Sequence, residues 1–213
     1  MSNNTRDICV VDYGVGNLQS VCTALDALKV RYRVSSSPEE VATARAYILP
    51  GVGAFAEAMR NLEARGLVEV LRREVVQNKK PLLGICLGMQ VLAEDSTEGG
   101  LIKGLGFISG HVVRISERSG YPVPHAGWNS LAVAKKEPLF GAMQDGAQFY
   151  FDHSYHFDTT PEYVAATCDY GAELTAAVQH DNIFGVQFHP EKSQNNGLRF
   201  LRNFMKYVDS HAK

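Results

Sequence analysis

The sequence predicts an α/β protein built on a mostly parallel sheet with helices on both faces. In the first half, short β-branched and apolar runs alternate with segments whose apolar residues recur at helical spacing. These strand candidates are apolar throughout, which is typical of strands buried on both faces. In the second half, short turns such as Asp181-Asn182 join the strand candidates, so added antiparallel hairpins are expected.

The first half of the chain alternates predicted strands and helices. Strands are expected at residues 8–11, 31–34, 47–49 and 81–85. A helix follows from Leu18 to Leu28, and another begins with Ser37 as N-cap, Pro38 in the first turn and Glu40 completing a capping box. Pro50 and Gly51 are expected to stop the third strand, and one long helix is predicted over residues 58–76.

The second half is richer in predicted strands and closes with a helix. Strands are expected at residues 107–115, 131–133, 148–151, 163–165, 174–178 and 183–188, and the helix at 196–208. We find no linker or repeat in the 213 residues, so a single domain spanning residues 1–213 is expected.

Composition excludes several classes of protein. The net charge is −2 and basic residues are scattered, so no nucleic-acid partner is expected. The four cysteines form no CxxC pair, so neither a zinc ribbon nor a redox dithiol is expected. No metal or other cofactor is expected. No window is apolar enough to span a bilayer, and the polar first residues contain no leader. A cytoplasmic protein without a membrane partner is the expectation.

Cys86 is the candidate nucleophile. Gly84 and Gly88 flank it at two residues on either side, the spacing of a nucleophile elbow, where a strand turns sharply into a helix. Side chains at the two glycine positions would collide in such a turn. The N-terminus of the helix, near Leu87, would favour the thiolate, and the Leu87 N–H could bind an oxyanion. The alternative is an inert cysteine beside two turn glycines.

His189 is the candidate base. The run FGVQF predicts a strand that ends at His189, and Pro190 keeps that residue extended. In an extended chain His189 and Glu191 point to the same side, so Glu191 can hold one imidazole nitrogen. Cysteine, histidine and carboxylate then form a catalytic triad. A surface pair at a strand end is the competing interpretation.

Several segments together resemble a known family. Residues 84–90 (GICLGMQ) and 189–191 (HPE) resemble the triad-type, class I glutamine amidotransferases, which have a flavodoxin-like three-layer fold. Further segments resemble the glutaminase subunits of imidazole glycerol phosphate synthases: DYGVGNL at 12–18, PGVGAF at 50–55, PHAGWN at 124–129 and FDHSY at 151–155. The resemblance extends over essentially the whole chain and implies hydrolysis of L-glutamine to glutamate and ammonia.

The resemblance also implies roles for individual residues. It suggests a second oxyanion donor at Gly51 or Val52, beside the Leu87 N–H. Substrate contacts are implied at Gly53, Gln90, Glu98, Ser154 and Tyr155. Gln90 also follows Cys86 by one helical turn and should face the same pocket. For Glu98, a solvated loop carboxylate is a serious alternative.

A partner is implied as well. The resemblance suggests a heterodimer with a (β/α)₈ cyclase subunit, which would use the ammonia to make imidazole glycerol phosphate and an aminoimidazole carboxamide ribonucleotide in histidine biosynthesis. Residues implied at the interface or its gate are Asn17, Trp128, Asn129, Tyr150 and Lys192. Trp128, the sole tryptophan, could equally be an exposed anchor or a core side chain.

Two positions depart from the family pattern. Ala126 replaces a usual Met, and Asp152 replaces a usual apolar residue. Both leave open a paralogous glutaminase that supplies ammonia to another synthase, for example for amidine formation on bacterial surface sugars. Two other classes fit less well. A dinucleotide-binding module lacks its last glycine at Gln19, and a thiol peptidase would not explain HPE near the end of the chain.

Overall fold

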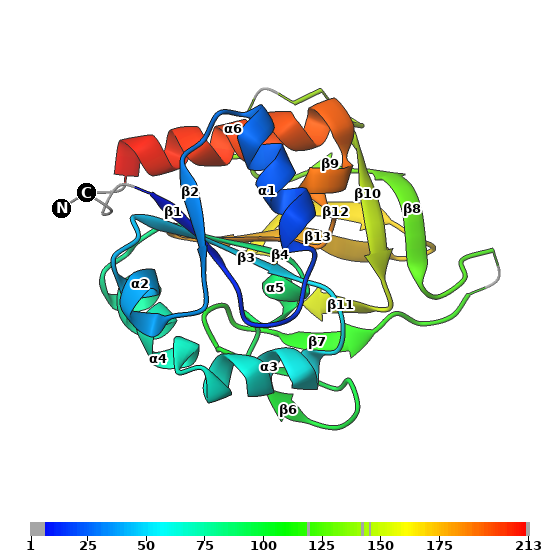
Figure 1. Ribbon diagram of the computed structural model, residues 1–213. Coiled ribbons are helices and arrows are strands. Elements are labelled where there is room, and N and C mark those ends of the chain that lie inside the picture. Colours follow the sequence, from blue (N-terminus) through cyan, green and yellow to red (C-terminus); the bar gives the residue numbers. More distant parts are fainter. Residues whose placement is uncertain (1–6, 119, 142, 145, 212–213) are drawn as a thin grey trace.

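The computed structural model describes residues 7–118, 120–141, 143–144 and 146–211, and within them a central eight-stranded sheet (Figure 1). Its strand order is β2-β1-β3-β4-β14-β13-β12-β9. The bounds are β1 Ile8–Val11, β2 Tyr32–Ser35, β3 Ala46–Gly51, β4 Leu82–Cys86, β9 Ala132–Val133, β12 Val164–Asp169, β13 Glu173–His180 and β14 Ile183–Val186. Strands β2 to β14 in that order are parallel, and β13, β12 and β9 continue the sheet antiparallel. The predicted fold class is confirmed.

Helices cover both faces of this sheet (Figure 1). One face carries α1 Leu18–Ala27 and α6 Gln194–His211, and the other carries α2 Pro38–Ala42, α3 Phe55–Ala64 and α4 Leu67–Leu71. Strand β1 shows the cause, because its alternate side chains point to opposite faces. Ile8 is buried in the core that includes Phe200 of α6, whereas Cys9 is buried in the core that includes Leu62 of α3. Both cores drive folding by removing apolar surface from water.

Two smaller sheets stand beside the central one. Strands β8 His125–Ser130 and β10 Gln148–His153 form an antiparallel pair on the right of Figure 1. The second is made of β11 Tyr155–Asp158, β7 His111–Arg114, β5 Asp95–Ser96 and β6 Ile102–Lys103. The turn between β10 and β11 brings these sheets together next to the carboxyl end of β4.

The long helix predicted over residues 58–76 was wrong. Helix α3 ends at Ala64, and α4 begins only at Leu67. Gly66 between them has φ 67°, which breaks the helical path. After α4 the chain continues as a π-helical segment, Arg72–Gln77, in which buried Glu74 pairs with Lys80 at 2.8 Å.

Pro50 does not stop the third strand, contrary to expectation. Strand β3 runs to Gly51, where Pro50 lies opposite Ile85 and Gly51 opposite Cys86. The extension places residues 50–51 directly beside the nucleophile candidate. The capping box is also only half formed. Ser37 accepts from the Glu40 N–H at 3.4 Å, but the Glu40 carboxylate accepts from the Ser35 hydroxyl instead.

Strand predictions in the second half were partly wrong. The run 107–115 forms a strand only at His111–Arg114, and strands β8 and β11 were not predicted. The predicted 181–182 turn does join β13 to β14 as a hairpin. No helix among the described residues is long and apolar enough to cross a membrane. Residues 1–6 and 212–213, which belong to the expected domain of 1–213 and include the segment expected to lack a leader, lie outside the described residues.

Candidate functional site

Cys86 lies at a sharp turn between strand and helix. It ends β4 and directly precedes the single-turn helix α5, Leu87–Gln90. Its backbone has φ 54° and ψ −111°, a region that L side chains rarely adopt. Such a conformation costs roughly 1–3 kcal/mol and persists only where surrounding contacts impose it. Because α5 is one turn long, its dipole supports a thiolate less than the sequence suggested.

The flanking glycines are there because this turn is crowded. A Cβ at Gly84 would lie 2.5 Å from the Gly88 carbonyl oxygen. A Cβ at Gly88 would overlap the Leu49 carbonyl oxygen of β3. The pattern GxCxG therefore reflects the close approach of the turn to β3, and Cys86 is only 6% exposed.

His189 and Glu191 meet just beyond β14, which ends at Val186 rather than at the predicted residue 188. His189 is extended, with φ −99° and ψ 95°, and the 3₁₀ turn Pro190–Lys192 that follows brings Glu191 back to it, in place of the extended chain that was expected. Its Nδ1 lies 2.7 Å from Oε1 of Glu191, and both side chains are 3% exposed. Its backbone N–H donates to the Tyr150 carbonyl at 2.8 Å, and its carbonyl accepts from the Ser193 hydroxyl at 2.6 Å. These bonds fix the imidazole against β10.

The side chain of Cys86 also interacts with the imidazole. Because Nδ1 is held by Glu191, this second interaction uses Nε2. Burial disfavours the imidazolium, but the hydrogen bonds and charges of Cys86 and Glu191 outweigh it and raise the pKa of His189 to about 10. The arrangement therefore favours the imidazolium form of His189.

Gln187 is a residue of this site that the sequence reasoning missed. It is fully buried, and its Nε2 donates to Sγ of Cys86 at 3.6 Å. Its Oε1 accepts from Nε2 of Gln90 at 3.0 Å. The prediction contained a signal for Gln187, because in the strand expected over 183–188 this residue precedes His189 by two positions and would point the same way. In the structure β14 ends at Val186, and Gln187 lies in the bend that follows.

The residues implied for the oxyanion lie around Cys86. Leu87 follows it in the chain, and Gly51 is its neighbour across the β3–β4 pair. A Cβ at Gly51 would lie 2.5 Å from Oη of Tyr13, so only glycine fits there. Val52 is 47% exposed, which places its side chain on the open side of the strand end.

A cavity of about 490 Å³ opens over Cys86. It is lined by Val52, Gly53, Cys86, Leu87, Gln90, Glu98, Arg114, Pro124, Asp152, His153, Ser154 and Tyr155. The structure thus brings together every residue implied for substrate contact. Arg114 and His153 are further lining residues that the sequence reasoning missed.

Glu98 and Gln90 have structural bonds as well as a place in the cavity wall. Glu98 Oε2 accepts from the N–H of Phe55 at 2.8 Å, the first residue of α3, where Ala54 provides no side-chain cap. Gln90 is 6% exposed and donates to the Tyr155 carbonyl at 2.9 Å. The amide nitrogen of Gln90 is therefore engaged with protein groups rather than free for a ligand.

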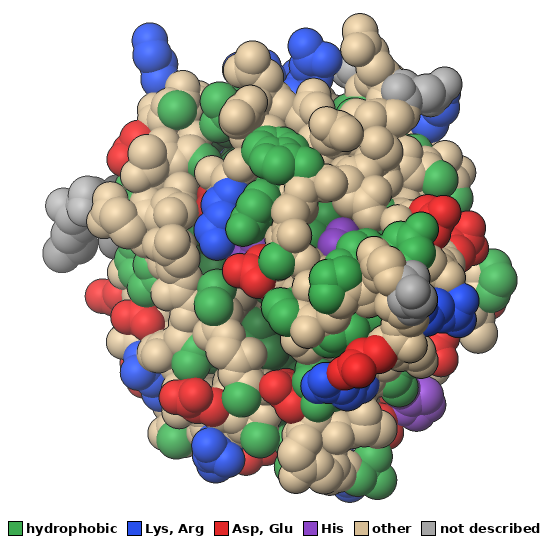
Figure 2. All heavy atoms as spheres, turned by 90° about the vertical axis from the view of Figure 1, so that its right-hand side faces the viewer, with side chains coloured by type: hydrophobic (Ala, Val, Ile, Leu, Met, Phe, Trp, Pro, Cys, Tyr) green, Lys and Arg blue, Asp and Glu red, His purple; other side chains and the backbone are tan. Residues whose placement is uncertain are grey.

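Three of the implied interface residues cluster on one surface. Trp128 is 46% exposed, and its ring lies edge-on to Tyr150 at 6.1 Å across the β8–β10 pair. Lys192 Nζ lies 5.6 Å from the Tyr150 ring centre. Viewed from this side, hydrophobic groups and uncharged surface cover much of the face (Figure 2). Trp128 is therefore a surface residue rather than a core residue.

Asn17 and Asn129 lie differently. Asn17 is exposed and caps α1, accepting from the Ser20 N–H at 3.2 Å. Asn129 follows Trp128 in β8 and so points to the opposite face of the strand. Its side chain donates to the Asp169 carbonyl at 2.8 Å and lies 3.3 Å from Nε2 of His125. The structure does not group Asn129 with the Trp128 surface.

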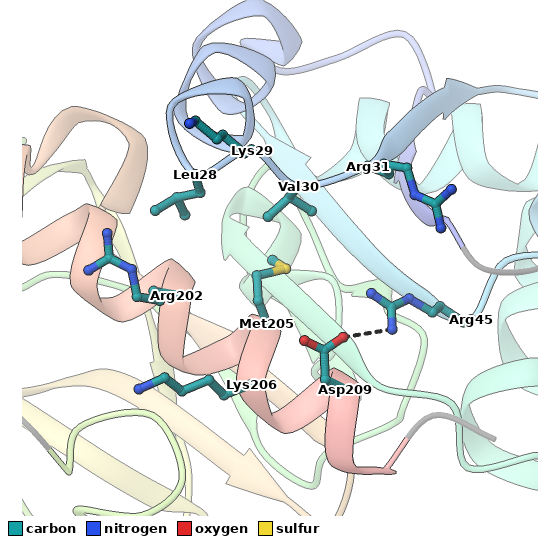
Figure 3. A pocket seen from close by; sticks show the side chains of 9 residues that line it. All are labelled: Leu28, Lys29, Val30, Arg31, Arg45, Arg202, Met205, Lys206 and Asp209. Carbon is teal, nitrogen blue, oxygen red and sulfur yellow. Dashed lines mark hydrogen bonds and ion pairs between the residues drawn. The ribbon is translucent and has the colours of Figure 1, made fainter.

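A second cavity among the described residues lacks the reactive groups found around Cys86. A cavity of about 470 Å³ between the end of α1 and α6 contains five basic side chains and Asp209. Figure 3 shows Arg45 directed at Asp209, 2.8 Å away, while Arg202 and Lys206 point to the other side. The cations do not converge on one point, and no cysteine or histidine lines this cavity. No group of three metal-ligating side chains occurs among the residues described.

Comparison with known families decides the classification. Residues 9–208 match the family described as glutamine amidotransferase class-I. The chain belongs to this family. As a glutamine amidotransferase it is an enzyme that hydrolyses glutamine.

Curated relatives of this amidotransferase are named imidazole glycerol phosphate synthase subunit HisH. One, HisH 1 of Campylobacter jejuni strain 81-176, is 44% identical over 93% of this chain and 99% of its own length. The Streptococcus mutans protein is 48% identical over 95% of this chain and 100% of its own length. The Geobacter sulfurreducens protein is 48% identical over 92% and 97%.

Solved structures share the fold of this amidotransferase. A glutamine amidotransferase matches with a TM-score of 0.74 at 21% identity, over 94% of this chain and 98% of that one. The PurLQS structure from Thermotoga maritima matches with a TM-score of 0.71 at 20% identity, over 95% and 98%. At such identities the likeness concerns the fold alone.

Proposed function

We propose that Cys86, His189 and Glu191 are the catalytic triad that hydrolyses L-glutamine. The observation that carries this proposal is the imidazole of His189, held between the buried Glu191 carboxylate at 2.7 Å and the strained Cys86. Sγ attacks the side-chain amide carbon, and His189 passes its proton to the departing ammonia. Water then cleaves the glutamyl thioester with His189 as base. Glu191 stabilises the imidazolium and fixes its tautomer.

The oxyanion of the tetrahedral intermediate needs donors beside Cys86. The Leu87 N–H is one, and we assign the second to the peptide at Gly51 or Val52, on the neighbouring strand. Backbone donors held in place before the reaction stabilise such an anion more than solvent water does. Removing a donor of this kind typically lowers kcat by about 100-fold or more.

The cavity wall carries charges that match the amino-acid end of glutamine. The carboxylate of Glu98 is assigned to binding the α-ammonium group. Its Oε2 caps α3, and the part of the carboxylate that faces the cavity can reach the ligand. The guanidinium of Arg114, also in the wall, suits the α-carboxylate. Gly53 lets the strand end approach the ligand, and Ser154 and Tyr155 offer backbone groups.

The proposed assembly is a heterodimer with a (β/α)₈ cyclase subunit, as in imidazole glycerol phosphate synthase. Relatives at 44–48% identity carry the name of that synthase's subunit HisH. The ammonia would react in the partner to give imidazole glycerol phosphate and an aminoimidazole carboxamide ribonucleotide in histidine biosynthesis. An exposed tryptophan beside Tyr150 and Lys192 is the kind of anchor that such an interface uses.

The direct test replaces the nucleophile. Together with the cyclase subunit, Cys86→Ala should lose glutamine-dependent synthesis by several orders of magnitude, because no thioester can form. Synthesis from added ammonium salt should remain at the parent rate, since the acceptor site is in the partner. Retained glutamine dependence in this variant would rule out Cys86 as nucleophile. The reaction is followed by formation of imidazole glycerol phosphate.

The partner surface is tested separately. Trp128→Ala should weaken cyclase binding by roughly 30-fold, the effect expected for a hot spot of about 2 kcal/mol. Val34→Ala is the matched control, because Val34 is similarly exposed at 42% but lies on β2, an edge strand of the central sheet, whereas Trp128 lies in the separate β8–β10 pair. Binding is measured by calorimetry. Equal affinities for both variants would exclude the Trp128 surface.

A second acceptor has one observation in its favour. Asp152 lines the cavity and is exposed, at a position where the family usually has an apolar residue. A paralogue of the same glutaminase could therefore pair with another synthase. Product analysis with the partner encoded beside this chain distinguishes the two, since only the histidine enzyme yields imidazole glycerol phosphate.

A further inference from the structure

A chain of hydrogen bonds, centred on two buried histidines, leads from strand β8 to the wall of the glutamine cavity. Nδ2 of Asn129 lies 3.3 Å from Nε2 of His125, and Nδ1 of His125 lies 3.0 Å from Nε2 of His153. Nδ1 of His153 in turn lies 2.8 Å from the carbonyl oxygen of Tyr155. The two histidines are only 2% and 6% exposed. The two imidazoles therefore depend on their neighbours for hydrogen bonds.

The direction of every bond follows from the last one. A carbonyl oxygen only accepts, so His153 must carry its proton on Nδ1. In a neutral ring Nε2 is then an acceptor, and His125 must donate to it from its own Nδ1. Nε2 of His125 is left as an acceptor for the Asn129 amide. Both imidazoles are thus held in the Nδ1–H tautomer.

Packing holds the rings in this arrangement. His125 is stacked between Phe151, with ring centres 4.6 Å apart, and Tyr170, at 3.9 Å. Burial lowers the pKa of His125 to about 4 and that of His153 to about 3, so both are neutral near pH 7. Asn129 cannot turn its amide around, because Nδ2 also donates to the Asp169 carbonyl at 2.8 Å.

The chain of bonds continues to the nucleophile. The same Tyr155 oxygen accepts from Nε2 of Gln90 at 2.9 Å, and Gln90 also donates to Gln187 at 3.0 Å. Gln187 donates to Sγ of Cys86 at 3.6 Å. A continuous series of hydrogen bonds, which includes the backbone carbonyl of Tyr155, therefore links Asn129 to a wall of the cavity and to the sulfur.

We infer that Asn129, His125 and His153 are positioning residues for glutamine hydrolysis, which set the Tyr155 carbonyl and, through Gln90 and Gln187, the orientation of Cys86. The inference rests on the proposed role of Cys86. It gives Asn129 a task different from the interface contact that the sequence suggested. Trp128, on the other face of β8, would place a bound partner directly over the strand on which this chain of bonds begins.

The decisive variant is Asn129→Asp, which replaces the donating NH₂ by an oxygen. His125 must then donate a hydrogen bond from Nε2 to the carboxylate. Either the donor and acceptor exchange roles in every bond of the chain, or His125 becomes positively charged. In the isolated protein, ¹⁵N NMR should show Nδ1–H for both rings in the parent and a protonated Nε2 at His125 in the variant. In the complex, kcat for glutamine should fall roughly tenfold, because a small misplacement of reacting groups is costly. KM should stay within about threefold, since the bonds act on the reacting sulfur.

Asn196→Asp is the control, because Asn196 also donates to a backbone carbonyl, at 3.1 Å, and the charge change is the same. It should keep the parent kcat and the parent ring signals. A parent in which His125 carries its proton on Nε2 would overturn the inference, as would an Asn129→Asp variant with the parent kcat. A parent that hydrolyses no glutamine would contradict the proposed function instead, while the ring signals still test the hydrogen-bond chain.

A second pair of variants covers poor folding of Asn129→Asp. His125→Asn keeps a donor near the position of Nδ1, whereas His125→Leu removes it. We expect kcat of the asparagine variant to be higher than that of the leucine variant by about fivefold or more at equal melting temperature. Equal kcat values for these two variants would show that His125 only fills space.

Discussion

The most informative single residue is Cys86, whose backbone conformation L residues rarely adopt. Two sets of contacts hold this backbone conformation. Strand β4 pairs in parallel with β3 and with β14, and the α5 turn packs against Leu49. The strained conformation presents the reacting atom of a nucleophile to its substrate, and the stability of the surrounding sheet offsets the strain energy. Stability and reactivity therefore compete at this position.

This competition predicts an unusual order of stabilities. Cys86→Gly should be more stable than Cys86→Ala by roughly 1 kcal/mol, because glycine adopts φ 54° without strain and this outweighs its larger unfolded-state entropy. Chemical denaturation of both variants measures the difference. An alanine variant as stable as the glycine variant would mean that the turn carries no strain.

At the scale of elements, the segment from α3 to α4 shows how one residue divides a helix. The apolar spacing continues through Arg65 and Gly66, so periodicity alone predicts one helix. Gly66 has a left-handed φ of 67° instead, and α4 starts in a new direction that packs Leu67 into the core. Glu98 then caps the free N-terminus of α3, which ties this helix to the cavity.

Gly66→Ala distinguishes a continuous helix from a broken one by the sign of its effect. In a continuous helix alanine would stabilise by about 1 kcal/mol. With φ 67° it should destabilise by roughly 1–2 kcal/mol, even though there is room for the added methyl group, since the nearest atom to its Cβ would be Cγ of Pro38 at 3.6 Å. The free energy of unfolding of the variant decides between them, and a stabilised variant would contradict the break.

For the whole molecule, the buried histidines contribute to the way stability depends on pH. His125 and His153 have pKa values lowered by burial to about 4 and 3, below the ordinary value of about 6.5. Their unfolded forms bind protons that the native forms do not. The two histidines therefore make their full contribution to the free energy of unfolding above about pH 6.5, and this contribution is lost as the pH falls toward 3. His189, whose pKa is raised to about 10, loses its contribution as the pH rises from about 6.5 toward 10.

The acid side of this profile gives a testable prediction. Between pH 6.5 and 4.5 the parent should lose stability more steeply than a His125→Asn/His153→Gln double variant. The difference in slope should be roughly one proton per histidine removed. Urea unfolding at the two pH values measures the slopes. Parallel slopes would mean that the two rings titrate alike in the folded and unfolded states.

Much of the fold and of the site could be predicted because local sequence encodes it. Apolar runs identified the parallel strands, the GxCxG spacing identified the turn at Cys86, and the HPE run identified the pairing of His189 with Glu191. Each depends on residues within a few positions of one another, where backbone geometry dictates which side chains meet. The class I amidotransferase fold follows from the same motifs taken together.

The tertiary structure decided what depends on distant segments. It extended β3 through Pro50, because pairing with β4 outweighs the missing N–H of a proline. It brought Gln187 onto the sulfur and joined His125 to His153 across β8 and β10, strands that the sequence did not fully predict. It also separated Asn129 from Trp128, although they are neighbours in the chain. Sequence by itself determined the reactive groups, whereas long-range packing determined how they are supported, because hydrogen bonds between remote residues form only after the chain has folded.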